Sequence, residues 1–290
     1  MGDSALRLCT ILVNEVRSAA VYTDNKIVTI SEINENLGTS IPNALDDLIH
    51  QDCLDDLQRI LHNAVIADFA GAPVSQSQVC APYLNPPKIW GIGLNFAEHA
   101  KDLNANHITD EPVSFMKPNT TIIGHGEPII LPLQSKRVTG EAELGVIIGK
   151  ECKNVSEEKA NEVISGYTTI LDMTAEDILQ RNPRFLTRAK SFDTFFSFGP
   201  WIVTPDEILD IQKLKITTLI NHKAHRSNFV ENMTFSPYQL ISFHSKVMTL
   251  QPGDIISCGT PGAVVLRPGD HVGCEIKSIG RLENPVRNTL

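Results

Sequence analysis

Hydrophobic residues gather along this chain in short β-branched runs that are bounded by Gly, Pro, Asn or Asp, as is typical of β-strands. Near the N-terminus, residues 6–13 and 18–30 are rich in Val, Ile, Leu and Thr. Beyond residue 88 the runs are residues 89–95, 127–132, 143–149, 213–221, 254–259 and 271–276. The pattern predicts many short strands.

The hydrophobic spacing changes between Pro42 and about Val65. Apolar residues recur there at three- and four-residue steps, which predicts one amphipathic helix over this range. The residues that set the spacing are Leu45, Leu48, Ile49, Leu57, Ile60 and Leu61.

Two further helices are predicted by their start signals. Thr204-Pro205-Asp206-Glu207 matches a capping box with proline at the first helical position. Ser236-Pro237 begins the second helix. The apolar face predicted for that helix consists of Leu240, Ile241, Val247 and Met248.

Residues 71–88 contain four prolines and no helical period, so we interpret them as a linker or boundary segment. This divides the chain into a small N-terminal α+β domain, residues 1–75, and a larger domain, residues 76–290. Many short strands with few helices predict a mainly β, closed or sandwich-like architecture for the larger domain, and an α+β class for the whole chain.

Composition and charge exclude several classes of protein. With 42% hydrophobic and 20% charged residues over 290 positions, dominant disorder is excluded. Lys and Arg number 25 against 34 Asp and Glu, so the net charge is −9. This balance, without a basic block, predicts no nucleic-acid partner and no anionic membrane partner.

The N-terminus and the cysteines indicate a cytoplasmic, soluble intracellular protein. Residues 1–10 lack the cationic and apolar regions of a secretory signal, and no apolar run reaches the roughly 18–20 residues that span a bilayer. The six cysteines form no CxxC pair and no zinc-type spacing, which favours buried free thiols in a reducing compartment.

Two glutamates open one of the predicted strands. Residues i and i+2 of a strand face the same side, so Glu141 and Glu143 point together. A solvated strand face is one interpretation. Because Gly140 precedes them and an apolar strand follows, a cation held between the two carboxylates is the other.

Asp172 ends a second apolar stretch, residues 166–172. It is either the N-cap of a helix that begins at Met173 or a third carboxylate beside Glu141 and Glu143. Three carboxylates would suit a hard cation, Mg²⁺ or Mn²⁺, better than zinc or copper.

Three other groups have both a chemical and a structural interpretation. His99 and Asp102 are neighbours on a helical turn, either as a base oriented by a carboxylate or as a surface pair. Lys190 is a solvated lysine or, if buried beside a metal, a group that stabilises an enolate. Residues 259–262 form a tight turn or an anion-contacting loop with the Thr260 hydroxyl.

The order of these motifs along the chain resembles the fumarylacetoacetate hydrolase family over roughly residues 88–287. The motifs are GxxLNFxEHAxD at 91–102, FMKP at 115–118, ExELGVIIG at 141–149, GYTxxxDMTAxD at 166–177, KSFDTFxxxGPWIVTPDE at 190–207 and LxPGDIIxxGTPG at 250–262. The N-terminal unit resembles the variable extra domain of longer family members.

The resemblance implies a fold and a set of site residues. The fold would be a mixed β-roll like a distorted barrel, usually assembled as a homodimer. Glu141, Glu143 and Asp172 would bind Mg²⁺ or Mn²⁺, and Lys190 would meet the developing enolate of the substrate. The pocket would be lined by Asn95, Lys117 and Thr260, and a lid dyad of His99 and Asp102 would activate water.

Several positions depart from the family pattern. Thr139-Gly140 replaces a common Asp-Tyr, Leu94 replaces a frequent arginine, and Glu176 stands where a basic residue is usual. Arg226 lies near a frequent glutamine, and the lid acid is Asp102 rather than Glu. The metal ligands and Lys190 follow the pattern, so the resemblance implies the metal chemistry but not one substrate.

The function predicted on this basis is a divalent-metal-dependent hydrolase that cleaves a C–C bond in an acylpyruvate-type 2-oxo acid. The alternatives on the same metal site are an oxaloacetate-type decarboxylase and a 2-hydroxymuconate-type isomerase. A non-catalytic homologue that binds a metabolite is the alternative from a different class.

Overall fold

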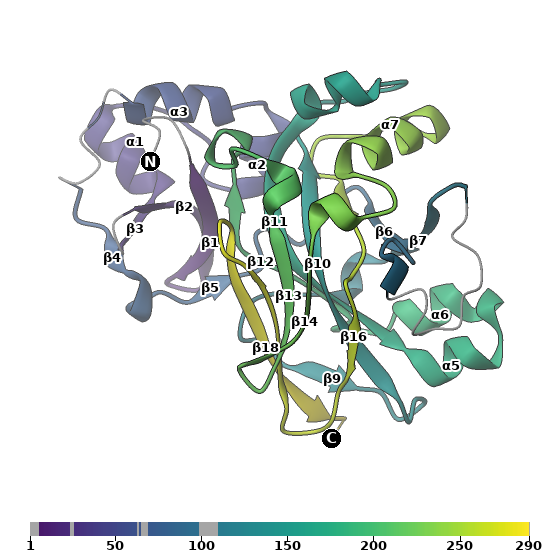
Figure 1. Cartoon of the computed structure of the whole chain (residues 1–290). Coiled ribbons are helices and arrows are strands. Elements are labelled where there is room, and N and C mark those ends of the chain that lie inside the picture. The colour runs from purple at the N-terminus through teal and green to yellow at the C-terminus, as the bar shows by residue number, and fades with distance from the viewer. Residues whose placement is uncertain (1–5, 24–25, 63, 65–68, 99–109, 290) are drawn as a thin grey trace.

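The computed structural model describes residues 6–23, 26–62, 64, 69–98 and 110–289, and its strands form two sheets (Figure 1). The large sheet has the order β4-β3-β2-β1-β12-β11-β10-β15-β6-β7, with β5 beside β1, β8 beside β12 and β16 beside β10. Its strands are β1 (Arg7–Val13), β2 (Val16–Thr23), β3 (Lys26–Thr29), β4 (Ala72–Pro73), β5 (Val79–Cys80), β6 (Ile89–Gly93), β7 (Val113–Lys117), β8 (Ile122–Ile123), β10 (Val138–Ile148), β11 (Ile164–Ala175), β12 (Phe196–Val203), β15 (Ile255–Ser257) and β16 (Ala263–Val265).

The small sheet has the order β14-β13-β17-β18-β9 and packs against β10 and β11. Its strands are β9 (Ile129–Leu131), β13 (Lys215–Ile220), β14 (Lys223–Phe229), β17 (His271–Ile276) and β18 (Gly280–Asn288). The α+β class predicted from the sequence is confirmed. Within the described residues the large sheet stays open between β4 and β7, so it forms no closed barrel.

β10 and β11 form the buried centre of the molecule, antiparallel along almost their whole length. Their side chains alternate between two apolar layers, because successive residues of a strand point to opposite faces. Leu144 and Val146 share a core with Val272 of the small sheet, whereas Ile147 shares one with Leu48 of the N-terminal helices. Most of these side chains are apolar because both faces are covered, and buried polar residues such as Thr168 and Thr169 donate to backbone carbonyls of β12.

The α-helices lie on two sides of the sheets (Figure 1). The N-terminal group packs with β1–β3, while α6 contacts β7 and β11 and α5 contacts β10 and β11. The α-helices are α1 (Ile30–Leu37), α2 (Leu45–His50), α3 (Leu54–His62), α5 (Glu176–Arg181), α6 (Leu186–Lys190) and α7 (Pro237–Val247). Short 3₁₀ turns are η2 (Val74–Gln76), η3 (Asn119–Thr121), η4 (Glu157–Val163), η5 (Pro183–Phe185), η6 (Pro205–Glu207), η7 (Ile211–Lys213) and η8 (Val230–Asn232).

The prediction of a single helix from Pro42 to about Val65 is wrong, because the structure has two helices there, α2 and α3. The chain turns between α2 and α3, where Asp52 adopts a left-handed backbone with φ of 54°. Leu48 and Leu57 still pack in the same core. The three- and four-residue spacing therefore identified the buried faces correctly, but it did not detect the turn.

Residues 71–88 are more ordered than the predicted linker. β4 pairs with β3, and β5 pairs with β1, so that this proline-rich segment adds edge strands to the large sheet. Strand β1 also pairs with β12 of the larger unit. The division of the chain after residue 75 stays a prediction.

The two helix start signals have different outcomes. At Ser236 the capping box is present, since the hydroxyl accepts from the Gln239 amide and α7 follows. Val247, however, lies on the exposed face of α7 and not on the predicted buried one. Thr204 is followed only by the η6 turn, because its hydroxyl accepts from the Leu6 amide at 2.9 Å instead of capping a helix.

The cysteines and the helix lengths were also predicted from the sequence. All six cysteines are free, as predicted, but Cys53 and Cys152 are only partly buried. Of the helices in the described ranges, none is long and apolar enough to cross a lipid bilayer.

Candidate functional site

Three carboxylates meet at one point of the β10–β11 pair. Glu141 lies directly opposite Asp172 in the strand register, and Glu143 follows on the same face of β10. Each of the three can place one oxygen within 4.8 Å of the others, and all three side chains are buried. The N-cap interpretation of Asp172 is wrong, because the residue lies inside β11 and α5 begins only at Glu176.

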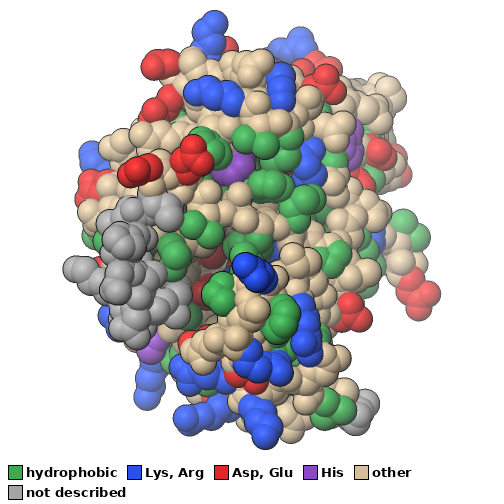
Figure 2. Space-filling view, turned by 90° about the vertical axis from the view of Figure 1, so that its right-hand side faces the viewer, with side chains coloured by type: hydrophobic (Ala, Val, Ile, Leu, Met, Phe, Trp, Pro, Cys, Tyr) green, Lys and Arg blue, Asp and Glu red, His purple; other side chains and the backbone are tan. Residues whose placement is uncertain are grey.

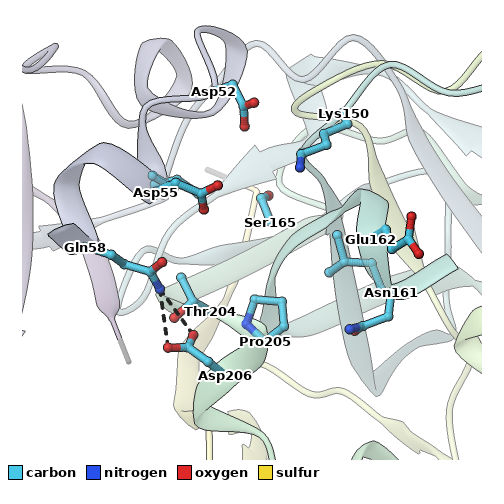
Figure 3. A pocket seen from close by; sticks show the side chains of 13 residues that line it. Asp52, Asp55, Gln58, Lys150, Asn161, Glu162, Ser165, Thr204, Pro205 and Asp206 are labelled. Carbon is cyan, nitrogen blue, oxygen red and sulfur yellow. Dashed lines mark hydrogen bonds between the residues drawn. The ribbon is translucent and has the colours of Figure 1, made fainter. Parts of the chain in front are cut away.

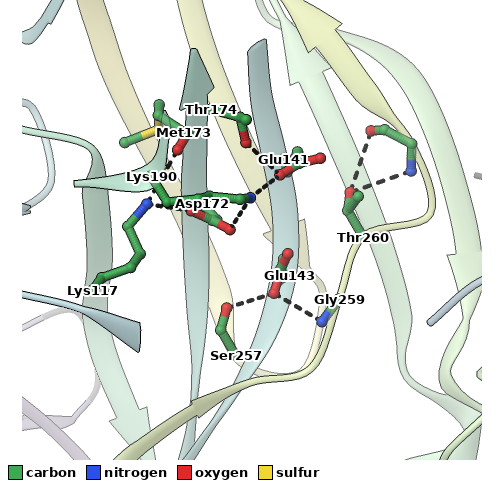
Figure 4. A network of polar contacts seen from close by, with 11 residues as sticks. Lys117, Glu141, Glu143, Asp172, Met173, Thr174, Lys190, Ser257, Gly259 and Thr260 are labelled. Atoms are coloured by element: carbon green, nitrogen blue, oxygen red, sulfur yellow. Dashed lines mark hydrogen bonds and ion pairs between the residues drawn. The ribbon is translucent and has the colours of Figure 1, made fainter. Parts of the chain in front are cut away.

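Two buried lysines balance this negative charge (Figure 4). Lys190, the last residue of α6, places Nζ 2.8 Å from Glu141 Oε2 and 2.5 Å from Asp172 Oδ2. Lys117, the last residue of β7, places Nζ 2.5 Å from Asp172 Oδ1 and also donates to the Met173 carbonyl at 3.1 Å. Buried charges of this kind persist only when they are paired and hydrogen-bonded.

The two lysines differ in how firmly they hold their protons. Burial alone would lower the pKa of Lys190, but the negative charges of Asp172, Glu141 and Glu143 outweigh it and raise the pKa well above the usual range. Burial lowers the pKa of Lys117 to about 8, despite the attraction of Asp172. Of the two lysines, Lys190 therefore holds its proton more firmly.

Glu143 is oriented by the strand and loop that face it. The Ser257 hydroxyl and the Gly259 amide both donate to its Oε2, at 2.5 and 2.8 Å. Burial, followed by the charges of Asp172 and Glu141, raises the pKa of Glu143 to about 8. Gly259 has φ of 95°, and a Cβ there would come within 2.8 Å of the Asn95 Cβ, so only glycine fits this contact.

The donor set fits a divalent metal ion. Glu141, Glu143 and Asp172 supply three hard oxygen donors from rigid, fully buried strands. Hard ligands of this type suit Mg²⁺ or Mn²⁺ rather than zinc or copper. The three positions are those that the sequence predicted as metal ligands.

A cavity of about 440 Å³ opens over two of these carboxylates. Its polar lining residues are Thr139, Glu141, Glu143, Thr174, Glu176, Gln180, Lys190 and Thr260, and apart from Gly93 the other lining residues are apolar. The apolar side chains are Ile92, Leu94, Val113, Phe115, Leu179, Pro183, Leu186 and Ala263. Figure 2 shows this side of the molecule, where hydrophobic side chains surround a hollow with acidic side chains visible inside it.

The other predicted pocket residues have more varied positions. Thr260 lines the cavity. Asn95 is buried with its amide engaged by the backbone of Phe235 and Cys258, and Lys117 lies beside Asp172. Neither Asn95 nor Lys117 is among the described residues that line the cavity. Their roles in binding substrate stay predictions.

The predicted dyad of His99 and Asp102 lies outside the described residues. The described part of that motif ends at Glu98, after Phe96, which pairs with Met233 in an isolated bridge. The assignment of His99 and Asp102 as a water-activating pair therefore also stays a prediction.

Three contact residues of the site were not singled out from the sequence. Ser257 holds Glu143, Thr174 donates to Glu141 at 3.2 Å, and the ring of Phe115 lies 4.6 Å from Lys190 Nζ. A cation over a ring at this distance is a favourable contact. Phe115 is a specified position of FMKP and Thr174 one of GYTxxxDMTAxD, which was the available signal. Ser257 occupies an unspecified position of LxPGDIIxxGTPG, so the motif gave no signal for it.

A second hollow of about 400 Å³ lies between α3 and the larger unit (Figure 3). Its lining includes Asp52, Asp55, Glu162 and Asp206, all of them exposed. The Gln58 amide donates to both carboxylate oxygens of Asp206 at 3.3 Å. Among the described residues, only the Glu141, Glu143 and Asp172 group converges as metal ligands would.

Comparison with protein families gives one matching model, described as fumarylacetoacetate (FAA) hydrolase C-terminal, over residues 88–287. Among curated relatives, the mitochondrial oxaloacetate tautomerase Fahd2a of Rattus norvegicus is 35% identical over 235 residues, which are 78% of this chain and 75% of that protein.

Solved structures of similar proteins cover nearly the whole chain. Maleylpyruvate hydrolase from Sphingobium sp. SYK-6, in complex with manganese and pyruvate, has a TM-score of 0.81 at 27% identity, covering 98% of this chain and 100% of that one. The 5-carboxymethyl-2-hydroxymuconate delta-isomerase from Mycobacterium smegmatis has a TM-score of 0.76 at 31% identity, covering 98% and 99%.

Proposed function

The chain belongs to the fumarylacetoacetate hydrolase family, and we propose that it is a divalent-metal-dependent hydrolase that cleaves the C–C bond of an acylpyruvate-type 2-oxo acid. The observation that carries this proposal is the convergence of three buried carboxylates beside a buried lysine. The cavity above them is large enough for a small metabolite, since ligand pockets span roughly 300–1,000 Å³.

Glu141, Glu143 and Asp172 would hold Mn²⁺ or Mg²⁺, with the manganese complex of maleylpyruvate hydrolase as support for the first ion. When bound, the ion supplies Lewis acidity for the carboxylate and 2-oxo oxygens of the substrate. Ser257 and Gly259 keep Glu143 oriented, and outer hydrogen bonds of this kind tune a metal site.

Lys190 is proposed to stabilise the enolate that forms when the bond to the acyl group breaks. Its ammonium group is held against the carboxylates and stays protonated, so it offers a fixed positive charge at the cavity floor. A preorganised charge of this type acts on the transition state more than on the ground state.

Water is the second substrate of the proposed reaction. Acylpyruvate and water give a carboxylate, pyruvate and a proton, with water oxygen bonded to the acyl carbon. We assign the removal of the water proton to His99, oriented by Asp102, on the basis of their spacing in the sequence. We propose in addition that the protein is a homodimer, as the family resemblance implies, and that it is cytoplasmic.

A second candidate reaction is the tautomerisation or isomerisation of a 2-oxo acid. The similarity to oxaloacetate tautomerase and to the hydroxymuconate isomerase favours it. Like hydrolysis, tautomerisation and isomerisation form an enolate of the 2-oxo acid. Unlike hydrolysis, they break no C–C bond and need no attacking water. The apolar part of the cavity lining favours the hydrolase over an oxaloacetate tautomerase, because oxaloacetate has no apolar tail to place against it.

A panel assay tests the proposal directly. Metal-free protein is titrated with Mn²⁺ by calorimetry and then incubated with acetylpyruvate, oxaloacetate and 2-hydroxymuconate, and products are separated by chromatography. Hydrolysis is supported if wild-type protein with Mn²⁺ converts acetylpyruvate to equal amounts of acetate and pyruvate. Wild type without Mn²⁺ and the Glu143→Gln variant should form neither product.

The other results of the panel are equally informative. Enol–keto conversion of oxaloacetate or isomerisation of 2-hydroxymuconate without acetylpyruvate cleavage favours the second candidate. Release of CO₂ from oxaloacetate favours a decarboxylase. Metal-dependent binding of all three acids without turnover indicates a metabolite-binding protein.

A further inference from the structure

The outer wall of the cavity is formed by one face of α5 and the segment that follows it. Glu176, Leu179, Gln180 and Pro183 line the cavity at three- and four-residue steps. Leu186 of α6 extends this wall. The wall therefore combines one carboxylate with apolar side chains, opposite the charged floor.

Glu176 is fixed in place by two contacts. The Arg137 Nε donates to its Oε2 at 2.5 Å, and the Gln180 amide donates to its Oε1 at 2.9 Å. The side chain of Glu176 is 13% exposed, whereas that of Arg137 is 49% exposed and does not line the cavity. Glu176 thus belongs to the cavity lining with both carboxylate oxygens hydrogen-bonded, whereas Arg137 lies outside that lining.

The described part of the cavity lining offers no cation to a second carboxylate of a ligand. Among the described lining residues, Lys190 is the only basic side chain, and it is already within 2.8 Å of Glu141 and Asp172. An anionic tail would therefore lie against Leu179 and Leu186 and near the Glu176 carboxylate. Burying an unpaired charge there is unfavourable, and the like charge adds to the cost.

We infer that Glu176 is a specificity residue that excludes a second carboxylate, so that the substrate carries an uncharged, apolar acyl tail. The inference rests on the proposed function, because it assumes a 2-oxo acid head at Glu141, Glu143 and Asp172. Glu176 is expected to act on the choice of ligand and not on the bond-breaking step.

Binding of two non-cleavable acids of equal chain length tests the inference without turnover. Calorimetry on Mn²⁺-loaded protein compares 2-oxohexanoate with 2-oxohexanedioate, which differ only in the terminal carboxylate. We expect wild type to bind the monoacid at least about tenfold more tightly. Glu176→Gln should narrow this ratio mainly through tighter diacid binding, because it removes the like charge and releases Arg137.

Two further variants make the test specific. Glu176→Gln combined with Arg137→Gln should retain part of the gain, since the repulsion is still gone but the released cation is lost. Glu151→Gln, an exposed acid beyond the far end of β10, should leave the ratio unchanged. Circular dichroism and the Mn²⁺ affinity of each variant report whether the fold and the floor are intact.

The outcomes separate the inference from the proposed function. Diacid binding as tight as monoacid binding in wild type, or a ratio that Glu176→Gln does not move, overturns the inference and leaves the metal site standing. Failure of both acids to bind in a Mn²⁺-dependent way overturns the proposed function, and the inference falls with it.

Discussion

Two hollows of similar volume, about 440 and about 400 Å³, contain acidic side chains, yet only one has the features of a chemical site. In the first, the exposed fractions of Glu141, Glu143 and Asp172 are 8%, 2% and 1%. In the second, the groove beside α3, Asp55 and Asp206 are exposed.

The difference lies in burial and convergence and not in the number of acids. The buried carboxylates are fixed by two paired strands and balanced by Lys117 and Lys190, so their charges act at short range with little screening. Solvent screens the groove carboxylates, and exposed ion pairs contribute little free energy. Matched substitutions in the two hollows should therefore have very different effects.

The largest effect is expected from Glu143→Gln. Glutamine keeps the shape and can still accept from Ser257 and Gly259, but it supplies no charge to a cation. Loss of a group that only hydrogen-bonds to a metal ligand lowers metal affinity by up to roughly 100-fold. Loss of the ligand charge itself should lower Mn²⁺ affinity by more than that, and turnover should fall to background. Calorimetry and product assays measure both quantities. Asp55→Asn in the groove is the control, and full activity of a chelated, metal-free wild type would contradict the metal site.

Lys190→Met should lower kcat by about 10²–10³, the usual result of losing one preorganised group that stabilises an anionic transition state. Without metal, the variant also leaves Glu141 and Asp172 with less positive charge, so its free energy of unfolding should drop by about 3–5 kcal/mol and recover with Mn²⁺. Lys150→Met, in the groove, should change neither. A change confined to KM would make Lys190 an anchor for the substrate carboxylate.

Ser257→Ala should weaken Mn²⁺ binding by about 10–100-fold while leaving the fold intact, because Glu143 loses a hydrogen bond that orients it. The matched control is Ser165→Ala, whose hydroxyl donates to the Ile147 carbonyl at the edge of the groove. That control should alter stability alone. Equal Mn²⁺ affinity in the two variants would show that the Ser257 contact does not tune the site.

Mn²⁺ affinity should also increase with pH up to about 8. Burial raises the pKa of Glu143 to about 8, so below that pH the metal-free protein holds a proton that the ion must displace. Affinity should therefore fall by up to about tenfold for each unit below pH 8 from this group. Calorimetry in buffers of different ionisation enthalpy counts the released proton. In Glu143→Gln the residual dependence on pH should be smaller.

The smallest effect is expected from Gln58→Ala in the groove. The substitution removes the two 3.3 Å contacts to Asp206, which are solvent-exposed, so the free energy of unfolding should change by about 0.5 kcal/mol or less. Thermal denaturation measures it. A cost above about 1 kcal/mol would indicate that this contact holds α3 against the larger unit.

The sequence by itself determined the features that depend on neighbours a few residues apart. The i and i+2 spacing placed Glu141 and Glu143 on one strand face, and the Ser236 capping box marked the start of α7. The ordered motifs identified the family and its three carboxylates. Such signals are readable because strand and helix periods are local properties of the backbone.

Tertiary structure decided the features that depend on distant parts of the chain. Asp172 could be a helix cap or a strand carboxylate until its pairing with Glu141 was known, and Thr204 bonds Leu6 instead of capping a helix. Ser257 reaches Glu143 across 114 positions of sequence. Strand pairing and burial bring these groups together, and a local pattern carries no information about either.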